Sequence, residues 1–125
     1  MPARSPEEAV RLATEGLNSG DINAILALYE PKASFLAQPG QIGTGTDALR
    51  QGFTAFLAMK PRMKIDSIRV VPGGDDIALV MLKWHFSGIG PDGKAMTMAG
   101  HSSDVARRQR DGTWLWVIDN PWGTA

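Results

Sequence analysis

Two polar side chains, Asp119 and Asn120, follow an apolar run near the C-terminal end of the chain and are the first candidates for chemistry. The run, 114–118, is β-branched and aromatic and comes after the turn pair Asp111-Gly112, which is typical of a central strand buried on both faces. A carboxylate at the end of such a strand is costly unless it is paired, hydrated or protonated. We therefore predict that Asp119 opens into an internal pocket beside a hydrogen-bond donor. The alternative is that it only caps backbone N–H groups near Asn120.

Three residues are candidate donors to this carboxylate: Tyr29, Trp84 and His101. Trp84 lies on the apolar face of a predicted strand, so its indole N–H is either satisfied in a core or turned toward a ligand. The neighbouring His85 falls on the opposite, outer face. His101 is either a general base or a hydrogen-bonded structural residue. We predict that at least one of the three donors lies within hydrogen-bonding reach of Asp119.

His101 and Asp104 share a predicted strand over 95–108. They are an odd number of residues apart, so in a regular strand only one of them faces the same cavity as Asp119. A bulge near Gly100 would change that relationship. We take Asp119, His101 and Asp104 as candidates for proton transfer, with a carboxyl pKa raised by a dry pocket.

Other kinds of site have little support in this sequence. There is no cysteine, which excludes disulfides, thiol catalysis and thiolate metal sites. The two histidines lack a His-x-x-x-His spacing, no Gly-x-Ser-x-Gly elbow occurs, and no Gly-Lys-Ser/Thr follows the glycines at 40, 43 and 45. These observations leave a largely apolar cavity for a small organic ligand, with acid–base chemistry that needs no cofactor or metal.

Length and charge narrow the class of protein. The 125 residues suit one domain over 1–125, and the 13 basic and 13 acidic residues give a formal net charge of zero. A net charge of zero lacks the excess of basic residues that is typical of proteins binding nucleic acid or a membrane surface. No apolar run approaches the roughly 20 residues of a membrane span, and no export signal is apparent, so we expect a cytoplasmic protein.

The elements that must position these side chains are three helices followed by long strands. Ser5 is predicted to cap the first helix, and Asp21 the second, which we expect to continue to Pro31. Thr46 or Asp47 is predicted to cap the third helix. Turn-rich segments separate the predicted strands, which are 33–37, 63–71, 77–87, 95–108 and the C-terminal one. The pattern predicts an α+β domain in which a curved sheet wraps a helical layer. Gly52, inside the third helix, predicts a close approach to another element.

The apolar side chains predict a core and an interface. The residues that we expect to be mostly buried are Leu17, Leu28, Phe35, Phe53, Phe56, Val80, Leu82 and Trp114. Trp116 or Trp122, together with Met81, Met96 or Met98, would leave too much apolar area on the sheet unless a second subunit covers one face. The sequence therefore predicts a homodimer.

Several local motifs, in this order, resemble the nuclear-transport-factor-2-like superfamily, which includes ketosteroid isomerases and SnoaL-like polyketide cyclases. They are Leu17-Asn18-Ser19-Gly20-Asp21, then 25–31 with Tyr29, then Ala33-Ser34-Phe35, Gly43-Thr44-Gly45 and Asp111-Gly112-Thr113-Trp114. The resemblance covers nearly the whole chain and extends to an uncharacterised branch ending in an Ile-Asp-Asn-Pro-Trp-like segment. It implies a cystatin-like or ketosteroid-isomerase-like cone of strongly curved, mixed but mainly antiparallel sheet, a pocket inside the cone and a homodimer formed through the sheet.

The resemblance also bears on individual residues. The ketosteroid isomerase base, an aspartate before a proline on the first strand, corresponds to Gln38, which cannot act as a base. Their oxyanion-stabilising aspartate falls near Asp104, and the acid–base residue of SnoaL-like cyclases lies close to Asp119. As residues that contact a ligand we take Tyr29, Phe35, Gln38, Phe56, Trp84 and Asn120.

Two functional hypotheses remain open at this point. In one, the chain is a cofactor-independent isomerase, cyclase or hydrolase that acts on a small apolar or polyketide-like molecule. In the other, it is a non-catalytic ligand-binding or dimerisation module. The two share one fold, and a fold does not decide a function.

Overall fold

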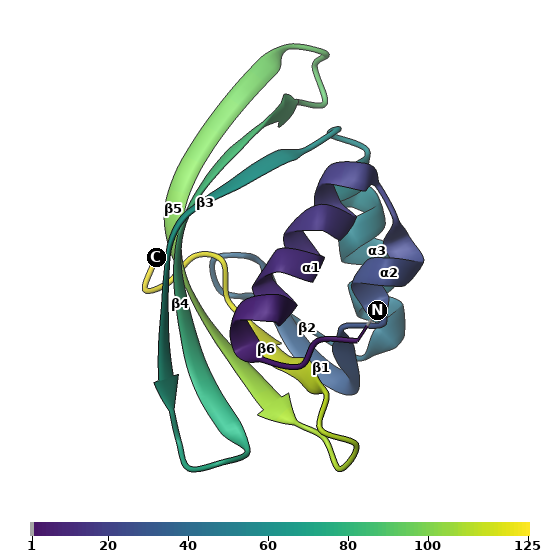
Figure 1. The fold of residues 1–125 in the computed structure, drawn as a ribbon. Coiled ribbons are helices and arrows are strands. Elements are labelled where there is room, and N and C mark those ends of the chain that lie inside the picture. The colour runs from purple at the N-terminus through teal and green to yellow at the C-terminus, as the bar shows by residue number, and fades with distance from the viewer. Residues whose placement is uncertain (1) are drawn as a thin grey trace.

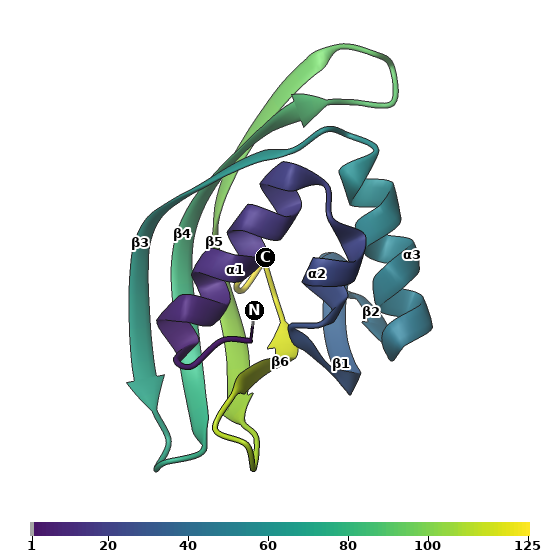
Figure 2. The same ribbon diagram turned by 45° about the vertical axis from the view of Figure 1, so that its right-hand side comes forward.

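The computed structural model describes residues 2–125 as three helices and one six-stranded sheet. The helices are α1 (Pro6–Ser19), α2 (Ile22–Leu26) and α3 (Thr46–Leu57), and the strands are β1 (Tyr29–Gln38), β2 (Gln41–Thr44), β3 (Arg62–Pro72), β4 (Ile77–Ile89), β5 (Ala95–Arg108) and β6 (Trp114–Asp119). The sheet curves strongly, and the helices lie on its concave side (Figures 1 and 2). The predicted α+β class is confirmed.

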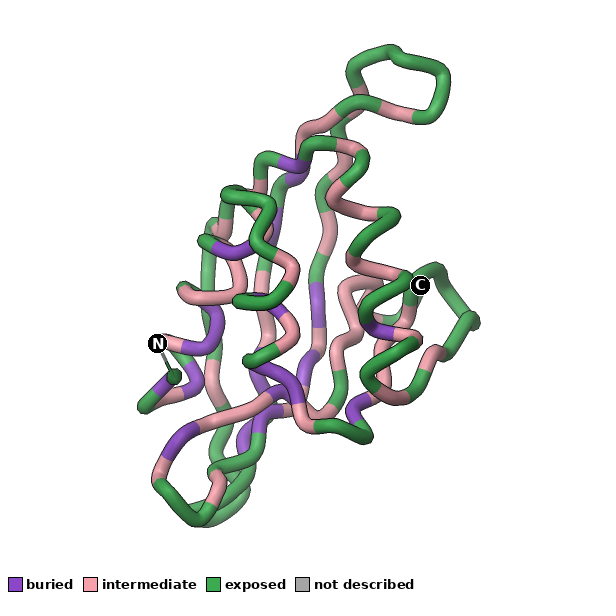
Figure 3. Tube along the Cα trace, turned by 90° about the vertical axis from the view of Figure 1, so that its right-hand side faces the viewer, coloured by how far each residue is buried: buried purple, intermediate pink, exposed green. Residues whose placement is uncertain are grey.

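The strand order across the sheet is β2-β1-β6-β5-β4-β3. All neighbours run antiparallel except β1 and β6, which are parallel. The sheet is therefore mixed but mainly antiparallel, and β6, which ends in Asp119, is central as expected from its apolar sequence. The β4–β5 hairpin extends beyond the helices and is exposed at its tip (Figures 1 and 3).

Side-chain caps start the first two helices where the sequence predicts. The Ser5 hydroxyl accepts the backbone N–H of Glu8 at 3.1 Å, and Gly20 ends α1 in the left-handed conformation at φ 73°. The Asp21 carboxylate then accepts the N–H of Ala24 at 3.1 Å and starts α2. These two caps turn the chain sharply between α1 and α2.

The expectation that the second helix reaches Pro31 is wrong. α2 ends at Leu26, and Tyr29 already pairs with Trp116 in the parallel β1–β6 ladder. The backbone N–H of Trp116 also donates to the Leu28 carbonyl at 2.8 Å. Pairing with a distant strand therefore overrides the local helical pattern.

Gln41–Thr44 form strand β2, which is not among the predicted strands and which pairs with β1 at Phe35. Neither Thr46 nor Asp47 caps α3, because the position before the helix is Gly45. Its φ of 94° is one that glycine adopts without strain, so a turn, and not a side-chain cap, starts this helix.

Strand β4 alternates as predicted, and its inner face is lined by Ala78, Val80, Trp84 and Phe86, all buried. The β4–β5 register runs without a shift from Ile77 opposite Arg107 to Ile89 opposite Ala95, so no bulge occurs at Gly100. Gly100 instead leaves room for the Trp84 ring, because a Cβ at this position would lie 2.8 Å from Trp84 Cζ2.

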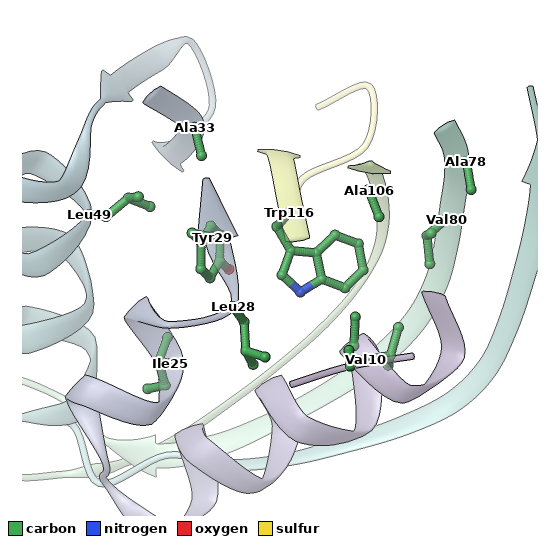
Figure 4. Packing of buried hydrophobic residues seen from close by; sticks show 12 residues of the cluster. Val10, Ile25, Leu28, Tyr29, Ala33, Leu49, Ala78, Val80, Ala106 and Trp116 are labelled. Carbon is green, nitrogen blue, oxygen red and sulfur yellow. The ribbon is translucent and has the colours of Figure 1, made fainter. Parts of the chain in front are cut away.

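The buried core lies between α1, α2 and the middle of the sheet, with Trp116 at its centre (Figure 4). Of the residues expected in the core, Leu28 and Val80 are buried. The others are only half-buried, namely Leu17, Phe35, Phe53, Phe56, Leu82 and Trp114. All of these except Trp114 line an internal cavity, which explains their remaining exposure.

Candidate functional site

A cavity of about 210 Å³ lies between the helices and the concave face of the sheet. All three helices and five of the strands contribute to its wall, with side chains that are mostly aliphatic or aromatic. They are Val10, Ala13, Thr14, Leu17, Ile25, Tyr29, Phe35, Leu36, Ala37, Gly52, Phe53, Phe56, Met63, Ile65, Leu82, Trp84, Phe86, Met98, Ser102, Asp104, Trp116, Asp119, Pro121 and Trp122. Such a wall suits a small, largely apolar ligand.

Asp119 reaches the cavity because β6 contains a bulge. Val105 of β5 pairs with Ile118, and the next residue, Ala106, pairs with Trp116, so Val117 is an extra residue in β6. In a regular strand Trp116 and Asp119 would face opposite sides of the sheet. The bulge places both side chains on the cavity side and leaves Ile118, 40% exposed, on the outer face.

The Tyr29 hydroxyl donates to Oδ2 of Asp119 at 2.5 Å. The predicted contact between Asp119 and one of three donors is thus confirmed for Tyr29. The ring of Tyr29 also packs against Phe53 of α3, with the two centroids 5.4 Å apart. A helix therefore holds the tyrosine at the end of the strand that carries Asp119.

A second carboxyl, that of Asp104, faces the same cavity and interacts with Asp119. Its Oδ1 accepts the backbone N–H of Asn120 at 2.8 Å, and its Oδ2 accepts the hydroxyl of Ser102 at 2.9 Å. We call Asp104 and Asp119 the carboxyl pair. The pair joins β5 to β6 at the wall of the cavity.

Burial raises the pKa of both members of the carboxyl pair. The pKa of Asp104 lies well above its ordinary value, first because of burial and then because of the Asp119 charge. Burial also raises the pKa of Asp119, although hydrogen bonds from Tyr29 and Asp104 oppose the shift. Burial and the Asp119 charge raise the pKa of the Tyr29 hydroxyl well above its usual range, so Tyr29 stays a donor.

Among residues 2–125, no lysine, arginine or histidine lines the cavity to compensate the negative charge of the carboxyl pair. Consistently, no cation contributes to the pKa of Asp104 or of Asp119. Two adjacent carboxylates without a counter-ion repel each other strongly in a medium of low polarity. The pair therefore holds one shared proton more readily than it ionises twice.

Pro121 and Trp122, in the segment after β6, line one side of the cavity and are held there by two indole hydrogen bonds. Trp84 Nε1 donates to the Pro121 carbonyl at 3.0 Å, and Trp122 Nε1 donates to the Leu36 carbonyl at 2.9 Å. The two indoles also meet edge to face, with centroids 6.3 Å apart. Trp84 thus has a satisfied N–H and at the same time forms part of the cavity wall.

Of the residues predicted to form the site, Tyr29, Phe35, Phe56, Trp84, Asp104 and Asp119 line the cavity. Phe35 is held by close packing, because a Cβ on Gly52 would lie 2.6 Å from its ring. The close approach predicted at Gly52 is thus confirmed.

Three of the predicted residues lie elsewhere. The regular register of β5 places His101 on the outer face, with an exposed side chain. Gln38 is exposed at the β1–β2 turn, beyond the last cavity residue of β1. The Asn120 side chain folds onto the C-terminal turn, where it donates to the Gly123 carbonyl at 2.8 Å. His85, as expected, is on the outer face, where it contacts Asp66.

Two residues with evident contacts at the site were missed in the sequence, namely Ser102 and Trp122. Ser102 is two residues from Asp104, so the alternation of a regular strand predicts that both share one face. Trp122 carried no comparable signal, because it follows the last strand and its position depends on the turn at Asn120.

Among residues 2–125, no three His, Cys, Asp or Glu side chains gather in a geometry that could hold a metal ion. In the same part of the chain, no helix has the length and apolar character needed to cross a membrane.

Comparison with known proteins places this geometry in a wider context. Residues 10–117 match the family model of the SnoaL-like domain. No curated protein matches the chain.

Several solved structures share the fold. A nuclear transport factor 2-like superfamily protein from Salmonella enterica is 21% identical, with a TM-score of 0.81 over 94% of this chain and 87% of the other. A candidate scytalone dehydratase from Novosphingobium aromaticivorans is 15% identical, with a TM-score of 0.83 over 94% and 80%. SalBIII, an epoxide hydrolase/cyclase-like enzyme in pyran ring formation of the polyether salinomycin, is 16% identical, with a TM-score of 0.76 over 93% and 88%. At these identities the likeness is one of fold.

Proposed function

We propose that this chain, which belongs to the SnoaL-like domain family, binds a small, largely apolar organic molecule in its cavity and transfers protons on it without a cofactor. The observation that carries the proposal is the carboxyl pair in the wall of an apolar cavity, with Asp104 buried and Asp119 bonded to the Tyr29 hydroxyl. A carboxyl with a raised pKa is suited to proton transfer near neutral pH.

The two carboxyls have different roles in this proposal. Asp119 accepts a hydrogen bond from Tyr29, which favours its ionised form, so Asp119 is the general base. Burial and the Asp119 charge raise the pKa of Asp104, so in this proposal Asp104 holds the shared proton and supplies the proton that is returned. Positioned acids and bases typically accelerate reactions by about 10² to 10⁴. Isomerisation, cyclisation and hydrolysis all fit this arrangement.

The charge of the cavity restricts the ligand. An anionic molecule would have to approach the carboxyl pair in a cavity whose wall has no basic side chain. We therefore propose a ligand without negative charge, such as a neutral apolar or polyketide-like compound. The enzymes that share the fold, among them an epoxide hydrolase/cyclase-like protein, support a reaction on an organic molecule of this kind.

The test uses 2-tetralone, a neutral, apolar ketone with acidic C–H groups. The protein is incubated with it in deuterated buffer, and loss of the α-proton signals is followed by NMR. We expect the wild type to accelerate exchange, and Asp119→Asn to remain folded and lose the acceleration. Asp76→Asn, a change at an exposed carboxylate, is the matched control and should behave as wild type. Exchange that is undiminished in Asp119→Asn would refute the assignment of Asp119.

A second candidate function is binding without turnover. It is favoured by Gln38, an amide at the position that corresponds to the isomerase base, which the structure places outside the cavity. Saturable binding of 2-tetralone by the wild type, with no exchange above background, would favour this alternative.

We also propose a homodimer formed through the outer face of the sheet. Trp116 and Trp122 do not contribute to that face, because the first is buried and the second lines the cavity. Apolar side chains on three strands nevertheless remain exposed, including Val71 at 49%, Leu79 at 39% and Ile118 at 40%. The cytoplasmic location expected from the sequence stays a prediction.

A further inference from the structure

Ser102 is a buried hydroxyl residue that the proposed function does not use. It is 4% exposed and lies two residues before Asp104, which is 5% exposed, on the inner face of β5. Its Oγ contacts Oδ2 of Asp104 at 2.9 Å, and its side chain also lines the cavity. A buried serine in this place is in a position to affect a neighbouring carboxyl directly.

The two members of the carboxyl pair differ in how they are held. Both oxygens of Asp104 have a donor, the Asn120 N–H on Oδ1 and the Ser102 hydroxyl on Oδ2. Apart from its interaction with Asp104 within the pair, Asp119 receives one hydrogen bond, from the Tyr29 hydroxyl to Oδ2. Asp104 is therefore fixed in orientation by its own strand and by the backbone after β6, whereas Asp119 has fewer restraints.

We propose that Ser102 is a positioning residue that, with the Asn120 N–H, fixes the orientation of Asp104 and helps this carboxyl to release its proton, while Asp119 acts on the ligand. The inference rests on the proposed function, because it divides the work between the two carboxyls of that site. Ser102 is not itself a catalytic residue, since it acts through Asp104.

The chemistry of a hydroxyl explains why serine suits this position. A serine hydroxyl rotates freely, so it donates to Asp104 when that carboxyl is ionised and accepts from it when it is protonated. The backbone N–H of Asn120 can only donate, so it directs the proton toward Oδ2, next to Ser102. Ser102 thus stays bonded to Asp104 in both protonation states, and it stabilises the ionised form more, because a hydrogen bond to a charged group is the stronger one.

The titratable groups that face Asp104 are few. Asp119 approaches from β6 and Tyr29 from β1, while the helices and β4 bring no titratable side chain to the cavity wall. Removal of the Ser102 hydroxyl therefore leaves the Asn120 N–H as the remaining donor that lowers the pKa of Asp104. We expect the pKa of Asp104 to rise further in Ser102→Ala.

The experiment is a pH titration of the aspartate carboxyl carbons by ¹³C NMR, in the full chain and without ligand. Ser102→Ala should shift the titration of Asp104 to higher pH, while Ser102→Thr, which keeps the hydroxyl, should restore the wild-type curve. Ser103→Ala is the matched control, because this neighbour lies opposite Met81 on the outer face. Ser102→Cys, a weaker donor of similar size, should give an intermediate shift and serves if the alanine variant does not fold.

The same variants are then assayed for exchange of 2-tetralone. We expect Ser102→Ala to lower kcat about tenfold, the equivalent of one lost hydrogen bond, with little change in KM. Its pH profile should shift together with the NMR titration. A titration of Ser102→Ala that matches those of the wild type and Ser103→Ala would overturn the inference, whatever happens to exchange. If the wild type itself fails to accelerate exchange, the proposed function falls, while a shifted titration still supports the effect of Ser102 on Asp104.

Discussion

The hydroxyl of Tyr29, the first residue of β1, donates a 2.5 Å hydrogen bond to the carboxylate of Asp119, the last residue of β6. The two residues are 90 positions apart in the sequence, and the parallel pairing of β1 with β6 brings them together. This contact connects the strand after the first helices to the strand that carries the proposed base.

Tyr29→Phe removes the donor and keeps the ring that packs against Phe53. Because the hydrogen bond lowers the pKa of Asp119, its loss should raise that pKa and shift exchange activity toward higher pH. We expect a loss of stability of about 1 to 3 kcal/mol at pH 8, measured by urea unfolding. An unchanged pH profile would show that Tyr29 does not control the ionisation of Asp119.

Asp104→Asn should make stability less dependent on pH. In the wild type the pKa of Asp104 is higher in the folded chain than its ordinary value of 3.8, so the folded state binds more protons above that pH. The contribution of this group is therefore fully present below about pH 3.8 and is lost as the pH rises through the folded pKa. The variant should be more stable than the wild type at pH 8 and similar to it at pH 3.5.

The measurement for Asp104→Asn is the difference in unfolding free energy between the two proteins at each pH. Groups such as Glu30, whose pKa is lowered by Arg107, lose their stabilising effect on acidification in both proteins and so cancel in the difference. A difference that stays constant from pH 4 to pH 8 would contradict the raised pKa of Asp104.

Gly52→Ala should destabilise the protein, although alanine normally favours a helix by about 1 kcal/mol. The added Cβ would lie 2.6 Å from the Phe35 ring, which then has to shift into the cavity. We expect a net loss of about 1 to 3 kcal/mol and weaker binding of 2-tetralone. In a Phe35→Leu background the same change should be much less costly, as a double-mutant cycle by thermal unfolding can show.

Trp122→Ala should open the cavity, because this indole lines it and is tied to the Leu36 carbonyl. We expect dissociation of 2-tetralone to become about tenfold faster, since about 1.4 kcal/mol of contact is equivalent to that factor. Trp122→Phe keeps an aromatic ring without the N–H, and its dissociation rate should lie between those of the wild type and Trp122→Ala. Stopped-flow tryptophan fluorescence measures the rates, and equal rates in all three proteins would show that Trp122 is no barrier.

Leu79→Lys should convert the proposed homodimer to a monomer, because it places a charge in the apolar outer face of the sheet. Ile42→Lys is the control, since Ile42 is 71% exposed but lies on the edge strand β2. Light scattering at micromolar concentration should report a dimer for the wild type and the control. A monomeric wild type would contradict the proposed interface.

Much of the fold could be predicted because it depends on local chemistry. Ser5 and Asp21 mark helix starts through caps that act over three residues. The alternation in β4 assigns Trp84 to the inside and His85 to the outside, because successive side chains of a regular strand face opposite ways. The same rule keeps His101 out of the cavity once the β4–β5 register proves regular.

The geometry of the site could not be predicted in the same way, because it depends on pairing between strands that are distant in the sequence. From the residues alone it follows that Asp119 ends an apolar strand and needs a donor, but not which face of the sheet its side chain takes. Only the extra residue at Val117, which appears when β6 is paired with β5, places Asp119 on the cavity side together with Trp116. The hydrogen bond from Tyr29 likewise requires the parallel β1–β6 ladder, whose register is set by packing across the whole sheet and not by residues near either partner.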